Sequence, residues 1–374
     1  MLFETPPLDS KEKEVTAEIR ELRTELQPLL RANRPWTGLL RKDLFARGLQ
    51  GSNSIEGYVA SDSDALAVVE GDEPLDTSDE TQAALTGYRD AMTYALRVVQ
   101  NPSFSYSSIL LTSLHFMLLR HDWKKHPGQW RPGAIYVREA DTGDIVYEGA
   151  PATDVPRLID ELVSRLNEEP RDGSLVVRAG MAHLNLTMIH PFSDGNGRMA
   201  RVLETLVMAE GGILEPPFCS IEEWLGKNTP AYYEVLAEVG GGSWQPRRDA
   251  RPWTRFVIRA HYQQTKTVAR RMTEAGRLFD ILEDLGQRLQ LPDRMIGPLF
   301  NAALGYVIRR STYCKMTDIS EWQASKDLKR LADTGLLSPK GEKRGRLYVA
   351  SDRLRGLRER SREPRGPIED PFAA

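Results

Sequence analysis

Cysteine and histidine are scarce in this sequence. Its 374 residues include two cysteines, Cys219 and Cys314, and six histidines. Two cysteines so far apart form neither the disulfide framework of a small secreted protein nor a zinc site. We expect them to be small buried residues in a reducing compartment. His115, His121 and His126 do not have the HExxH spacing of a helical zinc site, which favours core or surface roles for them.

Long hydrophobic runs are also lacking. The longest apolar stretch, residues 109–119, contains a histidine and is too short to cross a bilayer. The N-terminus soon becomes charged and shows no signal-peptide pattern. We therefore expect a cytoplasmic protein without a membrane partner.

Neither sign of charge dominates. The net charge is −3, and the hydrophobic share of 40% and charged share of 28% are ordinary for a soluble globular protein. The charge is uneven, however, because residues 301–374 carry +6 and the remainder carries −9. A basic C-terminal part raises the question of a nucleic acid or an acidic partner.

The most informative stretch is residues 189–201, Ile-His-Pro-Phe-Ser-Asp-Gly-Asn-Gly-Arg-Met-Ala-Arg. Apolar residues recur at spacings of three and four on both sides of it, which predicts two buried helices. Pro191 cannot continue the first helix, so His190 lies at or just past its end. The glycines permit unusual backbone conformations and leave the N–H groups of residues 195–197 free at the start of the second helix.

The chemistry of this stretch suits phosphoryl or nucleotidyl transfer. Free N–H groups at the positive end of a helix dipole form an anion site. His190 can accept a proton near neutral pH, and Asp194 is a hard oxygen ligand for Mg²⁺. Arg198 and Arg201 share a helix face and match phosphate oxygens. The alternative is a glycine-rich turn capped by Asp194 with solvated arginines. Agreement at many fixed positions favours the functional interpretation.

Residues 190–201 resemble the signature of the Fic family, His-Pro-Phe-x-Asp/Glu-Gly-Asn-Gly-Arg-x-x-Arg, with no departure at a fixed position. The resemblance implies a mainly α fold, with a Fic-type helical core and a small β-hairpin flap. It also implies transfer of AMP from ATP to a protein hydroxyl, with His190 as the general base and Asp194 holding Mg²⁺. The ATP-binding residues implied are Gly195, Asn196, Gly197, Arg198 and Arg201.

Residues 51–57, Gly-Ser-Asn-Ser-Ile-Glu-Gly, indicate by themselves a helix end with a glycine stop. They also resemble the family's inhibitory motif, Ser/Thr-x-x-x-Glu-Gly/Asn, with Ser52 and Glu56 in fixed positions. The resemblance implies an inhibitory segment over about 43–57, in which Glu56 reaches Arg201 and competes with the γ-phosphate for its guanidinium. Alternatively, Glu56 orients a water for the reverse reaction, the removal of AMP.

Two further segments gain meaning from the resemblance. Short β-favouring runs around an Asp/Gly turn predict a hairpin over about 134–149. It resembles the family's flap, on which a protein substrate docks by strand addition, although a surface hairpin without function is the alternative. Tyr232 and Tyr233 resemble the segment that closes over the adenine, yet aromatic residues at helical spacing also belong to cores.

After residue 291, short helices are followed by a small hairpin with a charged turn at 340–346, which resembles a winged helix. Lys326, Lys329 and Arg330 would face phosphates if this part bound DNA. We favour a domain that binds protein or only packs, so DNA is a partner that stays open but is not favoured.

These expectations combine into four parts. They are an N-terminal helical region (1–107), a Fic catalytic core (108–272), an α+β winged-helix-like domain (273–352) and a disordered tail (353–374). The expected function is a protein adenylyltransferase that modifies a Tyr, Thr or Ser hydroxyl and is autoinhibited by Glu56. The alternatives are AMP removal at the same site and a DNA-binding regulator whose core only senses nucleotide. Self-modification and a homodimer stay open.

Overall fold

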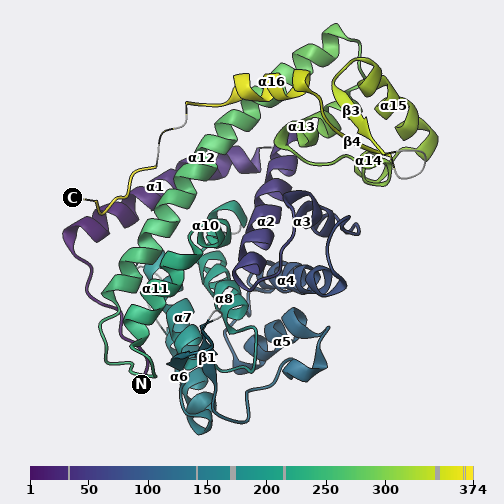
Figure 1. Ribbon diagram of the computed structural model, residues 1–374. Coiled ribbons are helices and arrows are strands. Elements are labelled where there is room, and N and C mark those ends of the chain that lie inside the picture. The colour runs from purple at the N-terminus through teal and green to yellow at the C-terminus, as the bar shows by residue number, and fades with distance from the viewer. Residues whose placement is uncertain are drawn as a thin grey trace.

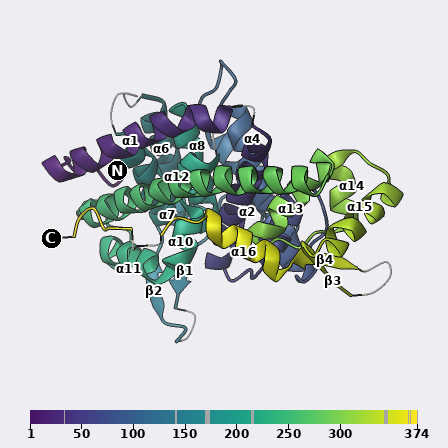
Figure 2. The ribbon, with the colours of Figure 1, turned by 90° about the horizontal axis from the view of Figure 1, so that it is seen from above.

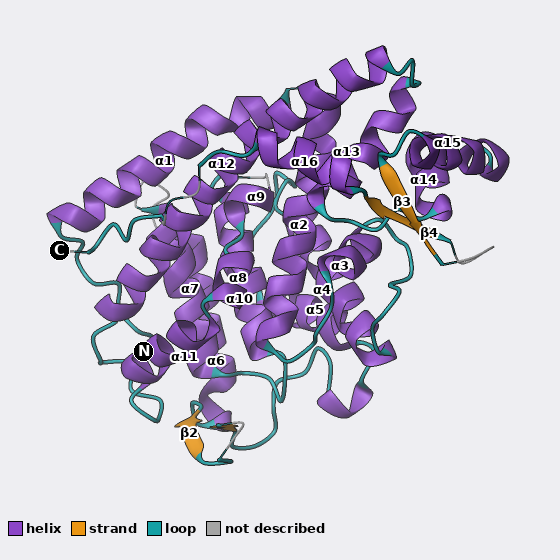
Figure 3. Ribbon diagram, turned by 45° about the horizontal axis from the view of Figure 1, so that its top comes forward, coloured by secondary structure: helices purple, strands orange, loops and turns teal. Residues whose placement is uncertain are grey.

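The computed structural model describes residues 1–32, 34–139, 142–168, 174–213, 216–341, 346–364, 366 and 368–373. Asp141 in the turn of the expected flap, residues 342–345 in the second charged turn, and residues 365, 367 and 374 of the tail lie outside this set. The described residues are mainly helical, with two small hairpins (Figures 1 and 3), which confirms the fold class expected from the sequence.

Helices supply nearly all the regular structure up to residue 288. They are α1 (Ser10–Arg31), α2 (Pro35–Ile55), α3 (Asp62–Val69), α4 (Asp79–Val98), α5 (Ser108–Leu119), α6 (Val155–Glu168), α7 (Leu175–Ile189), α8 (Asn196–Glu210), α9 (Pro216–Cys219), α10 (Glu222–Lys227), α11 (Thr229–Gly240) and α12 (Arg251–Arg288). Strands β1 (Tyr136–Arg138) and β2 (Ile145–Glu148) pair antiparallel between α5 and α6.

Helices α7 and α8 flank the 190–195 turn and lie at the centre of this bundle (Figure 1). Both are buried over almost their whole length, α7 from Val176 to Ile189 and α8 from Asn196 to Ala209. A helix that is covered on all sides belongs in a core, and it holds whatever its ends carry in a fixed place. The two buried helices expected around the motif are therefore confirmed.

Helix α2 joins two apolar clusters. Its first half contributes Trp36 and Leu40 to a cluster shared with α12 and the C-terminal helices. Its second half contributes Leu49 and Ile55 to the cluster around α7 and α8. At Gly51 the helix crosses α10 so closely that a Cβ would lie 2.4 Å from a backbone oxygen. The end of α2, which carries the candidate inhibitory residues, is thus held in one position.

Helix α12 is the longest of the described elements and runs along most of the molecule beside α1 and α16 (Figure 2). Trp253 and Val257 belong to the first apolar cluster, whereas Met272 and Leu278 belong to the second. The apolar stripe continues past residue 272, so the helix passes without interruption through the position where the sequence suggested a domain boundary.

In the described residues between α12 and the last helix there are three α-helices and a hairpin. They are α13 (Ile296–Leu304), α14 (Arg310–Thr317), α15 (Glu321–Asp333), β3 (Leu337–Lys340) and β4 (Leu347–Ala350). Ile308 adds a bridge to Tyr348 beside the hairpin. On α15, Lys326 and Lys329 are exposed, but the Arg330 guanidinium donates to the carbonyls of Leu289 and Gln290 at the end of α12. Arg330, although also exposed, therefore caps the end of a neighbouring helix.

The expectation of a disordered tail from residue 353 is wrong over its first part. Residues Asp352–Ser361 form helix α16, which lies along α12 (Figure 2). Leu354 and Leu357 are buried in the second apolar cluster, and Arg358 pairs with Glu274 at 3.1 Å. The many arginines suggested disorder, but an apolar pair at a spacing of three gave this segment a face to bury. None of the described helices combines the length and apolar character needed to cross a membrane.

Candidate active site

His190 caps the C-terminus of α7 in the left-handed conformation, with φ of 55°. Its Nδ1 lies 3.1 Å from the Thr187 carbonyl, which can only accept, so Nδ1 carries the hydrogen and the Nε2 lone pair is free. Removal from water lowers the pKa of His190 to about 4, and the nearby Arg131 cation also lowers the pKa. The ring is therefore neutral at physiological pH and able to accept a proton at Nε2.

The start of α8 faces the same turn. Gly195 is the N-cap with φ of 74°, and Asn196 and Gly197 form the first helical positions, whose N–H groups have no acceptor within the helix. The Gly195 N–H donates to Asp194 Oδ1 at 2.6 Å, so it is not free as expected from the sequence. The Asn196 side chain bonds both backbone groups of Phe192, at 2.9 and 2.8 Å, and thereby fixes the turn.

Arg198 lies under this turn with 1% of its surface exposed. Within the described part of the chain, its Nε and Nη1 have no hydrogen-bond partner, and the Tyr58 ring covers its guanidinium at 5.1 Å. A buried cation with unpaired donors is costly unless an anion completes the site. Its position beside the α8 N-terminus makes it a natural phosphate ligand.

Glu56 occupies the space above the first turn of α8. Arg201 donates from Nη2 to Glu56 Oε1 at 2.6 Å and from Nε to Ser52 Oγ at 2.7 Å. A Cβ on Gly197 would lie only 2.5 Å from Glu56 Oε1. The Glu56 carboxylate thus lies on both the arginine fork and the helix N-terminus, which are the groups that would bind a terminal phosphate.

Asp194 is the only acidic side chain of the turn, and its carboxylate is partly exposed. Burial opposes its ionisation, but the hydrogen bond from Lys125, at 2.7 Å from Oδ2, leaves the pKa of Asp194 below its usual value. The described residues contain no group of three or more His, Cys, Asp or Glu side chains arranged around a metal. An ionised carboxylate beside an anion site does fit Mg²⁺, which binds through one or two carboxylates together with substrate phosphates.

Tyr232 and Tyr233 have different environments. Tyr232 is 1% exposed, packs on Trp253, and its hydroxyl lies 2.9 Å from His183 Nε2. The structure therefore places Tyr232 in the core, the alternative that the sequence left open for both tyrosines. Tyr233 is 47% exposed, and its hydroxyl donates to the Ile55 carbonyl at 3.1 Å, beside Glu56. Of these two tyrosines, only Tyr233 offers a ring near the anion site for stacking.

A family model described as the Fic/DOC family matches residues 106–208, which include the turn, both central helices and the hairpin. The chain contains a Fic domain. The protein adenylyltransferase Fic of Nematostella vectensis is 25% identical over 268 residues, covering 68% of this chain and 55% of that protein. The protein of the same name from Culex quinquefasciatus is 28% identical, over 58% of this chain and 40% of its own length. The chain thus spans about half the length of these curated relatives.

Solved structures show the same fold around the Fic domain. A Fic family protein from Desulfovibrio desulfuricans G20 superposes with a TM-score of 0.59 at 20% identity, covering 93% of this chain and 98% of that chain. Fic-1 of C. elegans superposes with a TM-score of 0.54 at 22% identity, covering 69% and 72% of the two chains. At these identities the likeness establishes the fold alone.

Sequence reasoning missed several residues that shape the Fic site. His115 stacks on Phe192 with ring centroids 3.6 Å apart, and its two nitrogens contact the Gly128 N–H and the Asp194 carbonyl. Lys125 and Tyr58 contact Asp194 and Arg198 as described above. Each reaches the motif from a segment more than 60 residues away, so no local spacing could reveal it.

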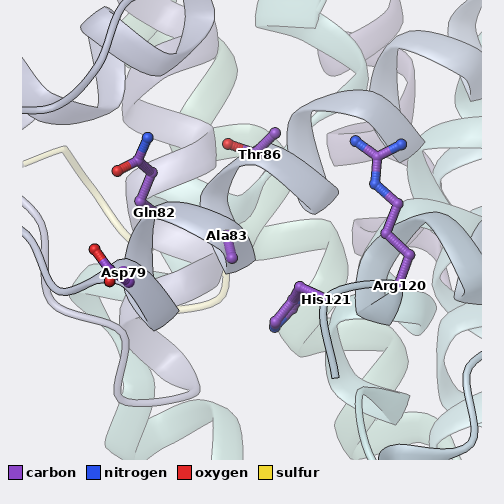
Figure 4. A pocket seen from close by; sticks show the side chains of 6 residues that line it. All are labelled: Asp79, Gln82, Ala83, Thr86, Arg120 and His121. Atoms are coloured by element: carbon purple, nitrogen blue, oxygen red, sulfur yellow. The ribbon is translucent and has the colours of Figure 1, made fainter. Parts of the chain in front are cut away.

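A hollow of about 380 Å³ lies between α4 and the end of α5, lined by Asp79, Gln82, Ala83, Thr86, Arg120 and His121 (Figure 4). None of the candidate site residues lines it. The candidate site is instead the N-terminus of α8, which the Glu56 carboxylate already contacts.

Proposed function

We propose that this protein is a protein adenylyltransferase that transfers AMP from ATP to a hydroxyl side chain of a target protein. The observation that carries the proposal is the set of groups at the start of α8: unpaired buried donors of Arg198, free first-turn N–H groups, and a neutral His190 with an available Nε2. Together they bind a polyphosphate and remove a proton, which is what nucleotidyl transfer requires. The names of the curated relatives support the same activity.

In the proposed reaction, the target hydroxyl oxygen attacks the α-phosphorus of ATP and its proton passes to His190 Nε2. A new P–O bond forms while the bond to the bridging oxygen breaks, and pyrophosphate leaves. Arg198 and the N–H groups of Asn196 and Gly197 hold the phosphates. Asp194 would hold Mg²⁺, which neutralises phosphate charge when bound. Tyr233 is the candidate for adenine stacking.

The hairpin β1–β2 is the proposed docking place for the protein substrate. It lies beside His190, because the Tyr147 hydroxyl donates to the Met188 carbonyl at 2.8 Å. Tyr136, Ile145 and Val146 are exposed on it, between 41% and 51%. A peptide that added a strand here would present its hydroxyl close to the base without a pocket shaped for one side chain.

Glu56 is the proposed inhibitor of this activity. Its carboxylate already holds Arg201 and covers Gly197, so a γ-phosphate must displace it before ATP seats productively. Removal of the carboxylate by Glu56→Gly therefore raises transfer, and Glu56→Gln tests whether charge or bulk is responsible.

The test compares labelling of proteins in a lysate by α-labelled and γ-labelled ATP. We expect label from the α-phosphate alone, stronger with Glu56→Gly, and lost in Glu56→Gly/His190→Ala. Label from the γ-phosphate would indicate a kinase instead, and α-label that survives His190→Ala would refute the role of the base. If the unaltered protein removes AMP from a modified target faster than Glu56→Gly does, the net reaction is de-AMPylation, with Glu56 orienting water.

A further inference from the structure

Arg131 lies on the segment that leads into the flap and is 4% exposed. Its guanidinium donates only to backbone carbonyls: from Nε to His190 at 2.7 Å, from Nη1 to Gly133 at 2.5 Å, and from Nη2 to Ala150 and, at 3.4 Å, to Ile189. No carboxylate in the described ranges pairs with it. A buried guanidinium whose hydrogen bonds all go to backbone carbonyls fixes the conformation of the backbone around it.

These carbonyls belong to two different structures. His190 and Ile189 end the catalytic helix α7, whereas Gly133 and Ala150 are the residues just before and just after the hairpin. One guanidinium therefore joins both ends of the flap to the residue proposed as the base. Its planar fork allows all three nitrogens to donate in different fixed directions, which a lysine ammonium cannot do.

The end of α7 explains why such a clamp is needed. The last carbonyls of a helix have no partner within the helix. Here the carbonyl of Thr187 accepts from His190 Nδ1, that of Met188 from Tyr147, and that of Ile189 from the Ala150 N–H at 3.3 Å. The Arg131 guanidinium provides the partner for the next carbonyl, that of His190, and its positive charge lies at the negative end of the helix dipole.

The backbone of His190 adds a second reason. A non-glycine residue in the left-handed conformation is strained by about 1–3 kcal/mol and persists only where its surroundings hold it. Arg131 fixes the chain at and just after this residue, because its backbone N–H donates to the Pro191 carbonyl at 2.9 Å while its Nε donates to the His190 carbonyl. The direction of the His190 ring depends on this peptide.

We propose that Arg131 is a positioning residue that locks the flap and His190 into one rigid unit, so that the base and the docked target hydroxyl keep a fixed relation. This inference rests on the proposed function for its catalytic consequence, but not for its structural one. Loss of the clamp frees the His190 peptide and the flap together. The nearby cation also lowers the pKa of His190, so its loss raises that pKa.

The test uses Arg131→Met, which removes fork and charge, and Arg131→Lys, which keeps the charge alone. Arg178→Met is the control, because the buried Arg178 side chain lies near the opposite end of α7, where it donates to the Leu166 carbonyl of α6 and pairs with Glu210 at 2.7 Å. The first readout is the ¹⁵N spectrum of histidine-labelled protein, with His190 assigned by His190→Ala. The second is amide exchange at Gly149 and Ala150.

In the unaltered protein and in Arg178→Met we expect a neutral His190 with hydrogen on Nδ1 and slow exchange at both amides. In Arg131→Met we expect a mixed tautomer, a higher His190 pKa and faster exchange at both amides. Arg131→Lys should keep the lower pKa but lose the slow exchange. A folded Arg131→Met with an unchanged tautomer and unchanged exchange would overturn the proposal, as would a change in only one of them.

The catalytic consequence is measured in the Glu56→Gly background. Misplacing a reacting group by about 1 Å costs about 100-fold in rate, so we expect Arg131→Met to lower kcat for AMP transfer by about that factor with an unchanged KM for ATP. If Arg131→Met does not fold, Arg131→Lys provides the test: faster exchange at Gly149 and Ala150 supports the proposal, and unchanged exchange overturns it. If even the Glu56→Gly parent transfers no AMP, the proposed function fails, while the tautomer and exchange data still decide the role of Arg131.

Discussion

The Lys125 ammonium lies 2.7 Å from Asp194 Oδ2, where a bound cation would sit. Glu56 lies at the place proposed for a phosphate, so the chain covers both halves of the proposed metal–nucleotide site with its own side chains. The Lys125 ammonium thus takes the place proposed for the metal ion, and the Glu56 carboxylate takes the place proposed for a phosphate.

Lys125→Met should strengthen divalent metal binding in the presence of ATP. The ammonium and the metal compete for one carboxylate, and the variant removes the competitor. Calorimetric titration of the protein–ATP mixture with Mn²⁺ measures this directly. Lys124→Met, the exposed neighbouring lysine, is the control and should bind Mn²⁺ like the unaltered protein. Equal affinity in both variants would show that Lys125 does not compete.

Gly197→Ala should weaken ATP binding about tenfold or more, even when combined with Glu56→Gly. The new Cβ would lie 2.5 Å from the present position of Glu56 Oε1, which is the place proposed for a phosphate oxygen, and would crowd that oxygen. Binding is measured by calorimetry. Gly38→Ala is the control, since a Cβ there meets nothing within 4 Å and should stabilise helix α2 by about 0.5–1 kcal/mol without affecting ATP. Normal ATP binding by Gly197→Ala would move the phosphate away from this turn.

Unfolding should depend on pH through His115. Burial lowers the pKa of His115 to about 4 in the folded state, below the ordinary value of about 6.5. The unfolded chain then binds the proton more readily, so stability is complete above about pH 6.5 and is lost as pH falls toward 4, by about 3 kcal/mol at most. Urea unfolding at several pH values measures this. His115→Gln should reduce the dependence without abolishing it, because burial also lowers the pKa of His190 to about 4, whereas His126→Asn, at an exposed histidine, should leave it unchanged.

Glu204→Gln should destabilise the fold by about 3–5 kcal/mol. Burial opposes ionisation, but hydrogen bonds from His183 at 2.6 Å and His261 at 2.9 Å hold the pKa of Glu204 at about 2. His261 in turn accepts from the buried Arg23 at 2.7 Å, so the variant leaves that cation without its counter-charge. Urea unfolding measures the loss. Glu18→Gln, which breaks an exposed pair with Lys266, should cost less than about 1 kcal/mol.

Part of the site was predictable because its residues are neighbours in sequence. Pro191 predicted the end of α7, and the glycines predicted the turn before α8. The contact between Glu56 and Arg201 was inferred only from the family resemblance, since 145 residues separate them. Tyr232 and Tyr233 were indistinguishable by pattern, because adjacent helical positions differ in burial only through what packs against them.

In the C-terminal tail, by contrast, composition led to a wrong prediction. Composition suggested disorder after residue 353, because arginines are frequent there. Leu354 and Leu357 nevertheless bury against α12 and α13, which supply an apolar surface that the tail cannot supply to itself.

The sequence alone determined the turn between two buried helices, with its histidine, carboxylate and arginines, because backbone preferences and helical spacing act over a few residues. Only the tertiary structure decided that Glu56 and Lys125 cover these groups and that Arg131 clamps the flap to His190. Those contacts join segments that lie far apart in the sequence. They form only when the whole chain packs, because burial is set by the packed chain and not by the residues next to each position.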